Sequence, residues 1–472
     1  MPLTILSQTQ LRSLLLSLTR DEVFALQRNL ALALRDYSIG NQDSGCSAVY
    51  QPRRTAITRQ DGCTTLFMPA STGHSTGMKV ISLQDADTAG CSTDDGPEPL
   101  GEETPLFETP GTRASMASLE SDGSELSVTS SGGGRASDPR GSTSQSSSNS
   151  IDAGCVNQQP VETGMSGTLG AWPGAGSRDT SPQGCQILLD EASLPFGMIN
   201  AHELTPFRTA LTATMLLNKR KKVRSVVVFG AGKQAYWHIR LALVLRGADI
   251  KRVFIINRSF DRAAELLRDI YAPENAEWRG EVKFSAISSD FGEYARVLHD
   301  TLHKADVIFC CTPSVQPLFP AELLTSREGR QKGRLISAIG SYKPHMTELH
   351  PDILREEVKV STSHWHFHKH VRHSGVVVVD SLTGAMKEAG EIVQAGIRPH
   401  QVVELGELLM VRYQSQGANA ENDDDAKSLR EWVETGNVIF KSVGMGLMDL
   451  VTGGDLIRLA GQRGVGTLVD NF

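Results

Sequence analysis

The residues best suited to chemistry in this sequence form a glycine-rich turn that reads Gly-Ala-Gly-Lys-Gln-Ala. Their spacing is that of the G-x-G-x-x-A motif, which binds the pyrophosphate of a dinucleotide. Gly230 permits the tight turn, Gly232 lets the backbone approach the phosphates, and Ala235 lets the following helix pack on the strand before it. Lys233 and Gln234 begin that helix, whose unpaired N–H groups and positive dipole end attract phosphate. The motif predicts a dinucleotide cofactor.

The three residues at the end of the next expected strand indicate which dinucleotide is preferred. They are Asn257, Arg258 and Ser259. An acidic side chain at this place would accept hydrogen bonds from the ribose hydroxyl groups of NAD(H). The sequence has no acid there, and the Arg258 guanidinium is suited to bind a 2′-phosphate. We therefore expect these three residues at the cofactor and predict that NADP(H) is preferred over NAD(H).

The elements that must position these residues are alternating strands and helices. Residues 226–229 are a continuous apolar and β-branched run, which is typical of a strand buried on both faces. Further strands are expected at 305–311, 334–338 and 376–380. Thr312 follows one of them, at the carboxyl edge where such sheets bind ligands. The alternation predicts an α/β fold with a Rossmann doubly wound parallel sheet.

Two further helices are expected near the N-terminus. Ser7 with Gln10, and Thr19 with Glu22, have the spacing of capping boxes that begin helices. Short strands are expected around 48–58, 64–68, 78–82 and 187–190. The last segment, from residue 436 onward, is expected to form a turn and a long, partly apolar helix.

Length, charge and composition exclude several classes of protein. The chain has 472 residues and a net charge of −7, so it has room for two or three domains and no basic stretch suited to nucleic acid. No apolar run is long enough to cross a membrane, and the N-terminus lacks the features of a signal peptide. The seven cysteines are scattered, which is typical of a reduced compartment, and we expect a cytoplasmic protein.

Two segments differ in composition from the rest. Residues 84–163 are rich in serine and glycine, and they hold too few large apolar residues to offset their ordering entropy. We expect them to form a disordered insertion. Residues 364–373 are rich in histidine, but no Cys, Asp or Glu joins them with the spacing of a ligand set. We therefore predict no metal site.

A series of short motifs resembles the ornithine cyclodeaminase/mu-crystallin family. They occur in the family's order: QPRRT at 51–55, MPA at 68–70, GMKV at 77–80, LTPFRTA at 204–210, TPS at 312–314, EAG at 388–390 and FKSVG at 440–444. The resemblance covers nearly the whole chain apart from the insertion. It implies an α/β substrate-binding and dimerisation domain beside the Rossmann domain. We place the former at 1–83 and 164–212, completed by 437–472, and the Rossmann NAD(P)-binding domain at 213–436.

The same resemblance implies the site residues. Arg54, Lys79 and Arg208 match basic residues that surround a small amino or imino acid, and Arg208 also reaches the cofactor. An α-carboxylate is well bound by a guanidinium and a neighbouring cation in a site that excludes water. The resemblance implies three further contacts, to the cofactor by Thr168 and Ser442, and to the substrate by Val443. The implied partners are a small amino or imino acid and a second copy of the chain, without nucleic acid or membrane.

One departure from the family pattern concerns the reaction. Where cyclodeaminases carry an aspartate, this sequence has Tyr342, or Ser341 if the alignment shifts by one. Cyclodeamination of ornithine needs a carboxylate to receive the side-chain ammonium and to move protons. The sequence therefore favours an NAD(P)H-dependent reductase of a small cyclic ketimino acid, of the pyrroline- or piperideine-2-carboxylate type, by hydride transfer to the imine carbon. Lys79 and Tyr342 are the candidate proton sources.

Several alternatives stay open. Within the family, the chain could be an ornithine cyclodeaminase that forms proline and ammonia. An amino-acid dehydrogenase or an amine-condensing synthase is a further enzymatic alternative. A protein similar to mu-crystallin that binds NADPH or a small ligand without catalysis is the alternative outside enzymes.

Overall fold

The structure is a computed structural model, and it describes the chain except for residues 1, 41–44, 61–62, 85–181, 360–375 and 415–423. Three predictions therefore concern residues outside the described part: the insertion at 84–163 apart from its first residue, Thr168, and the histidine-rich residues 364–373. Among the described residues, no helix is long and apolar enough to cross a membrane. The same residues contain no group of three or more His, Cys, Asp or Glu side chains that could hold a metal ion.

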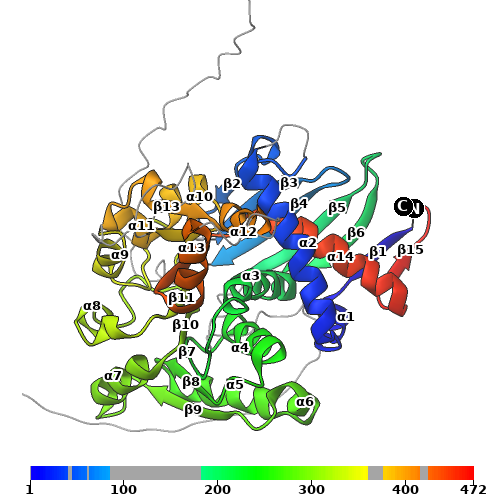
Figure 1. The fold of residues 1–472 in the computed structure, drawn as a ribbon. Helices are drawn as coiled ribbons and strands as arrows, with labels where there is room; N and C mark the ends of the chain where they lie inside the picture. Colours follow the sequence, from blue (N-terminus) through cyan, green and yellow to red (C-terminus); the bar gives the residue numbers. More distant parts are fainter. Residues whose placement is uncertain (1, 41–44, 61–62, 85–181, 360–375, 415–423) are drawn as a thin grey trace, which may run out of the picture. The chain divides into compact units, whose positions relative to one another are not determined.

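The larger sheet has eight parallel strands in the order β13-β12-β14-β11-β10-β7-β8-β9 (Figure 1). Their bounds are β7 (Ser225–Phe229), β8 (Arg252–Asn257), β9 (Lys283–Ser288), β10 (Val307–Cys310), β11 (Leu335–Ala338), β12 (Val377–Val379), β13 (Val402–Glu404) and β14 (Val438–Lys441). Every residue of β7, β10, β11, β12 and β14 is buried, as expected of strands covered on both faces. The predicted Rossmann sheet is confirmed.

The winding direction of this sheet reverses beside β7. The chain runs outward from β7 through β8 to β9, and then returns to place β10 on the other side of β7. Such a switch point leaves a crevice at the carboxyl ends of the two central strands. The helices of this part are α4 (Lys233–Arg246), α5 (Phe260–Tyr271), α6 (Ala276–Arg279), α7 (Tyr294–Lys304), α8 (Glu322–Thr325), α9 (Pro351–Glu357), α10 (Leu382–Glu388), α11 (Gly390–Ala395), α12 (Leu405–Gln414) and α13 (Asp424–Thr435).

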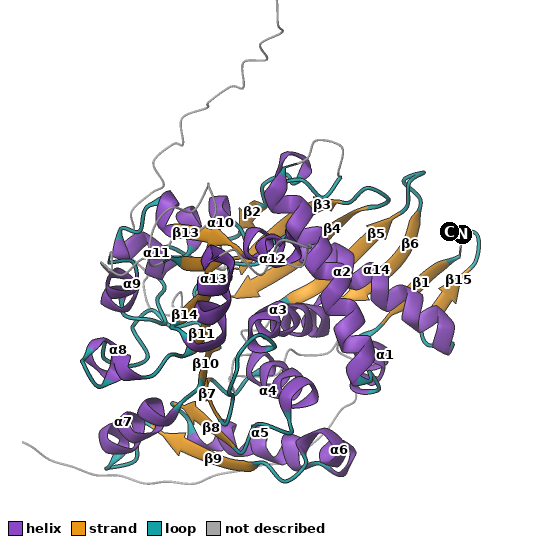
Figure 2. Ribbon diagram, in the orientation of Figure 1, coloured by secondary structure: helices purple, strands orange, loops and turns teal. Residues whose placement is uncertain are grey.

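The second sheet has seven strands in the order β15-β1-β6-β5-β4-β3-β2 (Figure 2). Its strands are β1 (Leu3–Leu6), β2 (Thr55–Thr58), β3 (Cys63–Ser71), β4 (Thr76–Gln84), β5 (Gln183–Leu189), β6 (Pro195–Asn200) and β15 (Thr467–Val469). Strands β2 to β6 pair antiparallel, whereas β1 is parallel to β6 and antiparallel to β15. The accompanying helices are α1 (Gln8–Leu16), α2 (Arg20–Ile39), α3 (Ala201–Leu217) and α14 (Gly446–Arg463).

Helix α3 joins the two sheets. All its residues are buried, and it contacts β5 and β6 of the smaller sheet as well as β11 of the larger one. Helix α14 packs on the same smaller sheet and on α2 and α3. Because α3 and α14 both carry ionisable side chains into this buried layer, they can supply charged groups to a site between the sheets.

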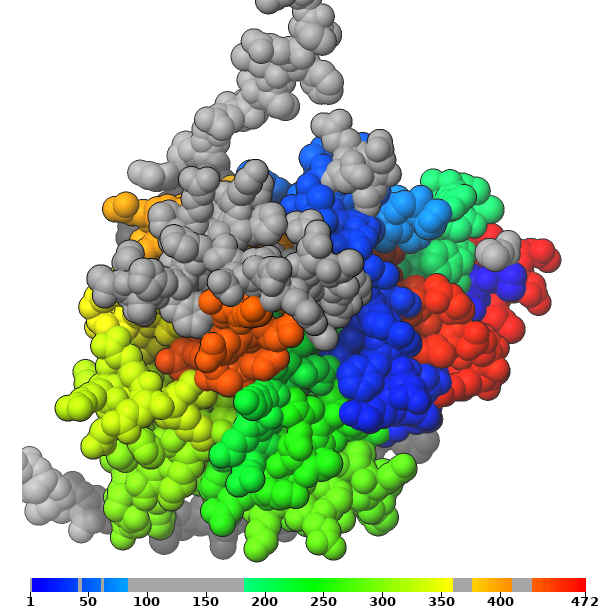
Figure 3. Space-filling model, viewed as in Figure 1, coloured from blue at the N-terminus to red at the C-terminus, as the bar shows by residue number. Residues whose placement is uncertain are grey.

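The two ends of the chain meet on one face of the molecule. Both predicted capping boxes are present, so Ser7 begins α1 and Thr19 begins α2. Arg463, in the last turn of α14, forms an ion pair with Glu22 and donates to Ser17 Oγ at 2.6 Å. The N-terminal helices and the C-terminal segment accordingly lie side by side (Figure 3).

Two strands differ from the sequence-based expectation. We predicted that 437–472 would belong with the smaller sheet and form a turn and a helix, but residues 438–441 form β14 inside the larger sheet, between β11 and β12. Strand β1 was not predicted either. Both are segments of four residues, three of them apolar, and such segments are too short for periodicity to distinguish a strand from the edge of a helix.

Candidate active site

A cavity of about 180 Å³ opens between the two sheets, at the switch point of the larger one. Nine of the predicted site residues line it: Arg54, Lys79, Arg208, Gly232, Lys233, Gln234, Tyr342, Ser442 and Val443. Six others are not among its lining residues: Gly230, Ala235, Asn257, Arg258, Ser259 and Thr312. We call the part around Arg54, Lys79 and Arg208 the basic end, and the part around the turn into α4 the glycine end.

The glycine end is built by backbone geometry. Gly230 has a φ of +108°, and a Cβ added there would lie 2.8 Å from the carbonyl oxygen of Cys311, so the turn needs glycine. A Cβ at Gly232 would meet nothing within 4 Å, which leaves the backbone open to the cavity. Helix α4 has no side-chain cap, and its first backbone bond runs from Tyr236 N to Gly232 O. The preceding N–H groups are thus available to phosphate oxygens, and the turn fits a dinucleotide.

Lys233 brings a positive charge to this helix terminus. Its ammonium contacts Glu203, a carboxylate of α3 that is fully buried. Trp237 Nε1 also donates to Glu203, at 3.2 Å, and Arg12 lies 3.7 Å from it. Glu203 therefore fixes the first turn of α4 against α3 and holds Lys233 at the cavity wall.

The end of β8 lies beside the cavity rather than in its wall. Asn257 Nδ2 donates to the carbonyl oxygen of Ser259 at 2.8 Å, and Ser259 caps α5 by accepting from Arg262 N. These two side chains shape the turn locally. Arg258 is exposed, and its carbonyl oxygen accepts from Ser288 Oγ at 3.0 Å. Arg258 directly follows β8 and lies outside the cavity wall.

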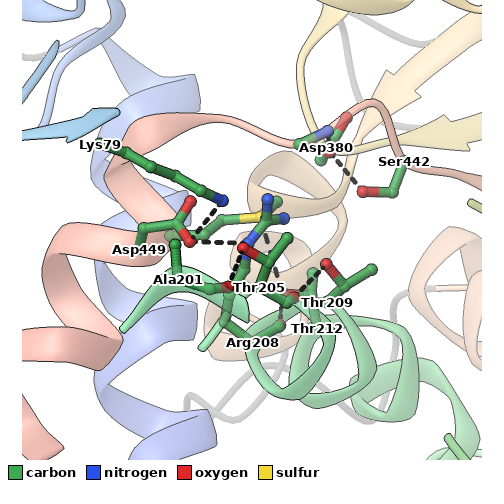
Figure 4. A network of polar contacts seen from close by, with 11 residues as sticks. Lys79, Ala201, Thr205, Arg208, Thr209, Thr212, Asp380, Ser442 and Asp449 are labelled. Carbon is green, nitrogen blue, oxygen red and sulfur yellow. Dashed lines mark hydrogen bonds and ion pairs between the residues drawn. The ribbon is translucent and has the colours of Figure 1, made fainter. Parts of the chain in front are cut away.

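The basic end contains a buried group of three charges (Figure 4). Lys79 of β4 is completely buried, and its Nζ lies 2.9 Å from Asp449 Oδ1. Arg208 of α3 donates from Nε to the same Oδ1 at 3.2 Å. Burial lowers the pKa of Lys79 from its ordinary 10.5 to about 8, and Asp449 opposes that change. One carboxylate thus forms ion pairs with two cations at the cavity wall.

Arg54 forms a second, more exposed ion pair at this end. Its Nε donates to Glu388 Oε1 at 3.0 Å, and its Nη2 donates to the carbonyl oxygen of Tyr342 at 3.4 Å. Burial raises the pKa of Glu388, whereas the Arg54 guanidinium lowers it. The Tyr342 ring packs against an apolar wall on β3 and β4 whose cavity-lining members are Leu66, Met68, Ile81 and Leu83.

A short loop after β14 closes the cavity over Arg208. Ser442 Oγ donates to Asp380 at 2.6 Å, and the N–H groups of Val443 and Gly444 donate to the same carboxylate at 3.3 and 2.7 Å. Gly444 has a φ of +82°, and a Cβ there would lie 2.8 Å from Arg208 Nη2. Asp380 and Gly444 therefore set how closely this loop approaches the arginine.

The loops after β10 and β11 are tied together by Glu348. This buried carboxylate accepts from Thr312 N at 2.7 Å and from Gly340 N at 2.6 Å. Burial raises its pKa from 4.5 to about 7. Thr312 is thus held by Glu348 outside the cavity wall, while its neighbours Cys311 and Pro313 line the cavity.

Sequence reasoning gave no role to the acids that pair with these residues: Glu203, Glu348, Asp380, Glu388 and Asp449. Of these, Glu388 stands in the EAG motif at 388–390. Two of them carry a signal in the sequence. Asp380 follows an apolar strand at the carboxyl edge of the sheet, and Asp449 is a charge within an apolar helical segment. An isolated acid in such a segment indicates a buried partner of opposite charge.

The chain is similar to several known proteins. Residues 183–410 match the family model described as the ornithine cyclodeaminase/mu-crystallin family. An uncharacterised protein of Saccharomyces cerevisiae is 27% identical over 240 residues, which is 47% of this chain and 62% of that protein. A Δ1-pyrroline-2-carboxylate reductase of Bacillus cereus is 25% identical over 291 residues, or 59% of this chain and 71% of the relative.

Two solved structures share the fold. An archaeal alanine dehydrogenase dimer with bound NAD has a TM-score of 0.58 and 18% identity, with all of both chains covered. A Δ1-pyrroline-2-carboxylate reductase of Thermococcus litoralis, in complex with NADH and L-proline, has a TM-score of 0.58 and 16% identity, and the match covers 98% of this chain and 99% of that one. At these identities the likeness concerns the fold.

Proposed function

We propose that the chain is an NAD(P)-dependent oxidoreductase similar to the ornithine cyclodeaminase/mu-crystallin family, whose model matches residues 183–410, and that it reduces a small cyclic ketimino acid. The substrate class is that of pyrroline- and piperideine-2-carboxylate. The observation that carries the proposal is the convergence of Arg54, Lys79 and Arg208 on one cavity that also opens onto the turn into α4.

Charge at the basic end suits a substrate with one carboxylate. Arg54 is balanced by Glu388, whereas Lys79 and Arg208 share Asp449. The described charges at this end therefore sum to one positive charge, which a single carboxylate neutralises. The apolar wall on β3 and β4 offers an uncharged surface for the rest of the ring.

The residues around the cavity have distinct proposed roles. Arg208 and Arg54 bind and orient the carboxylate, and the loop at 442–444 with the Tyr342 ring excludes water. Lys79 holds the proton that the imine nitrogen needs, with Tyr342 as a second candidate. The nicotinamide cofactor, when bound, supplies the hydride. The N–H groups at the start of α4, together with Lys233 and Gln234, would hold its phosphates, and Ser442 would lie beside its nicotinamide.

The second enzymatic candidate, ornithine cyclodeaminase, needs a carboxylate free to receive a second ammonium. Among the described residues that line the cavity, none is acidic. Glu388, the acid beside Arg54 at the basic end, is paired with that arginine. Both observations favour the reductase.

The test is NADPH oxidation by the purified protein with pyrroline- and piperideine-2-carboxylate, with ammonia release from ornithine plus NAD as the parallel assay. We expect oxidation that depends on the ketimine, and we expect Lys79→Met to lower kcat by about 10²–10⁴-fold. Ammonia from ornithine without ketimine turnover would favour the cyclodeaminase. Cofactor binding without either reaction would favour a binding protein.

Preference for NADP(H) over NAD(H) rests on Arg258. The exposed guanidinium at the end of β8 is placed to pair with a 2′-phosphate. Arg258→Asp should abolish the preference for NADPH in kcat/KM. Arg252→Asp, at the other end of the same strand and also exposed, is the matched control and should leave it unchanged. Equal preference in both variants would refute the role of Arg258.

We also propose a homodimer in a cytoplasmic setting. Strand β2 is an exposed edge strand, with Ile57 54% exposed, and Val49 before it is 72% exposed. Apolar side chains beside an unpaired strand edge favour contact with a second copy. Sedimentation of the purified protein would decide the oligomeric state.

A further inference from the structure

Asp449 has a position that neither packing nor helix formation requires. It lies on α14 with no exposed surface, and its Oδ1 accepts from Lys79 and Arg208. Its other oxygen, Oδ2, is buried and has no hydrogen-bond partner among the described residues. A buried polar atom without a partner is rare in folded proteins and calls for an explanation. The half-satisfied carboxylate indicates that its charge is what the site uses.

The surroundings of Lys79 otherwise favour a neutral amine. Lys79 is fully buried, and the charges that face it from other elements are Arg208 on α3, Arg54 before β2, and Asp449 on α14. On the two neighbouring strands, the residues paired with Lys79 are Met68 of β3 and Gln186 of β5, and neither side chain ionises. Burial and two guanidinium groups disfavour an ammonium, and Asp449 is the one acid among these groups.

We propose that Asp449 is a positioning residue that keeps Lys79 in its ammonium form and holds that ammonium at the cavity wall (Figure 4). The inference deepens the proposed reductase and rests on it for its chemical role. Asp449 also accepts a hydrogen bond from Arg208. One carboxylate therefore fixes the proposed proton donor, Lys79, and the proposed carboxylate-binding arginine relative to each other.

The step assigned to Lys79 is balanced. One Nζ–H bond breaks and an N–H bond forms at the imine nitrogen, while the imine carbon accepts the hydride that the reduced nicotinamide cofactor of the proposed function provides. The π electron pair of the C=N bond stays on nitrogen. Lys79 becomes a neutral amine that remains hydrogen-bonded to Asp449, and water that enters after product release returns its proton.

The first test reads the protonation of Lys79 without turnover. The full chain is labelled with [ε-¹³C]lysine, the Lys79 signal is identified by its loss in Lys79→Met, and its shift is followed with pH. In Asp449→Asn, which keeps the size of the side chain, we expect the midpoint to fall by about 1–3 pH units. Asp455→Asn is the matched control, because Asp455 is a buried acid on the same helix that bonds Asn29 and Arg458 instead. An unchanged midpoint in Asp449→Asn would overturn the proposal.

The second test uses turnover of a cyclic ketimine. The ammonium form is the active one, so kcat should fall as pH rises through the pKa of Lys79, and in Asp449→Asn that fall should begin at lower pH. A merely structural role would lower kcat equally at every pH, which would contradict the inference. If Asp449→Asn does not fold, Asp449→Glu keeps the charge and should retain the wild-type midpoint with a lower kcat. A displaced midpoint there would count against the proposal. A wild-type chain that reduces no ketimine would contradict the proposed function, and the NMR titration would still decide the role of Asp449.

Discussion

The two ends of the cavity obtain their polar contacts in different ways. At the basic end, the buried carboxylate of Asp449 is met by side-chain cations from β4 and α3. At the glycine end, the buried carboxylate of Glu348 is met by the backbone N–H groups of Thr312 and Gly340. Side-chain charges can be removed one at a time, whereas backbone donors persist in every substitution except one to proline. The basic end therefore depends on each of its charged side chains, whereas the glycine end depends on its backbone path and on the pair of Lys233 with Glu203.

The largest effect should follow removal of the Asp449 carboxylate. Asp449→Ala leaves Lys79 and Arg208 buried without a counter-ion, which should lower the free energy of unfolding by about 3–5 kcal/mol in urea titrations. Glu388→Ala is the control, because its ion pair with Arg54 has side chains 19% and 29% exposed and should cost less than about 1 kcal/mol. Equal losses in the two variants would contradict the distinction between a buried and a half-exposed pair.

A smaller effect is expected from the pH dependence of Glu348. Its pKa is about 7 in the folded protein against 4.5 ordinarily, so the folded state binds more protons between these values. The free energy of unfolding should therefore fall as pH rises from 4.5 to 7, by up to about 3 kcal/mol from this group. In Glu348→Gln, urea titrations across this range should show a shallower fall. The control is Glu357→Gln, since the pKa of Glu357 is also about 7 but the hydrogen bonds that tie Thr312 and Gly340 together go to Glu348. It should flatten the fall without changing cofactor affinity, and an undiminished slope in Glu348→Gln would refute the assignment.

The smallest effect concerns the loop where the two ends meet. Gly444→Ala places a Cβ at a φ of +82° and 2.8 Å from Arg208 Nη2, so the loop or the guanidinium must shift. We expect a loss of about 1–2 kcal/mol in stability and a raised KM for the ketimine, because the arginine is displaced. Gly454→Ala on α14 is the control, since a Cβ there meets nothing within 4 Å, and its KM should equal that of the wild type. Equal KM values in both variants would contradict the role of the loop.

The same difference between the two ends explains what the sequence could predict. The turn at Gly230 and Gly232 is contiguous, and its spacing is fixed by the geometry of one strand and one helix, so the Rossmann sheet could be predicted and is confirmed. The resemblance to the family agrees with the family model that matches residues 183–410. The basic residues were found by resemblance to a family. Their acidic partners were not, because Asp449 is 370 residues from Lys79 and no local rule links them. Strand β14 was missed because a segment of four residues is too short to show a period.

The wide separation of Lys79 and Asp449 also has a consequence for biosynthesis. A ribosome adds about 5–20 residues per second, so the 370 residues between them take roughly 20–70 s to appear. Strands β3 and β4 leave the ribosome long before α14, and closing them around an unpaired lysine would bury a charge without its counter-ion. The nascent chain therefore avoids burying an unpaired charge if strands β7 to β11 pair first and the basic end stays open until α14, which carries Asp449, has been synthesised.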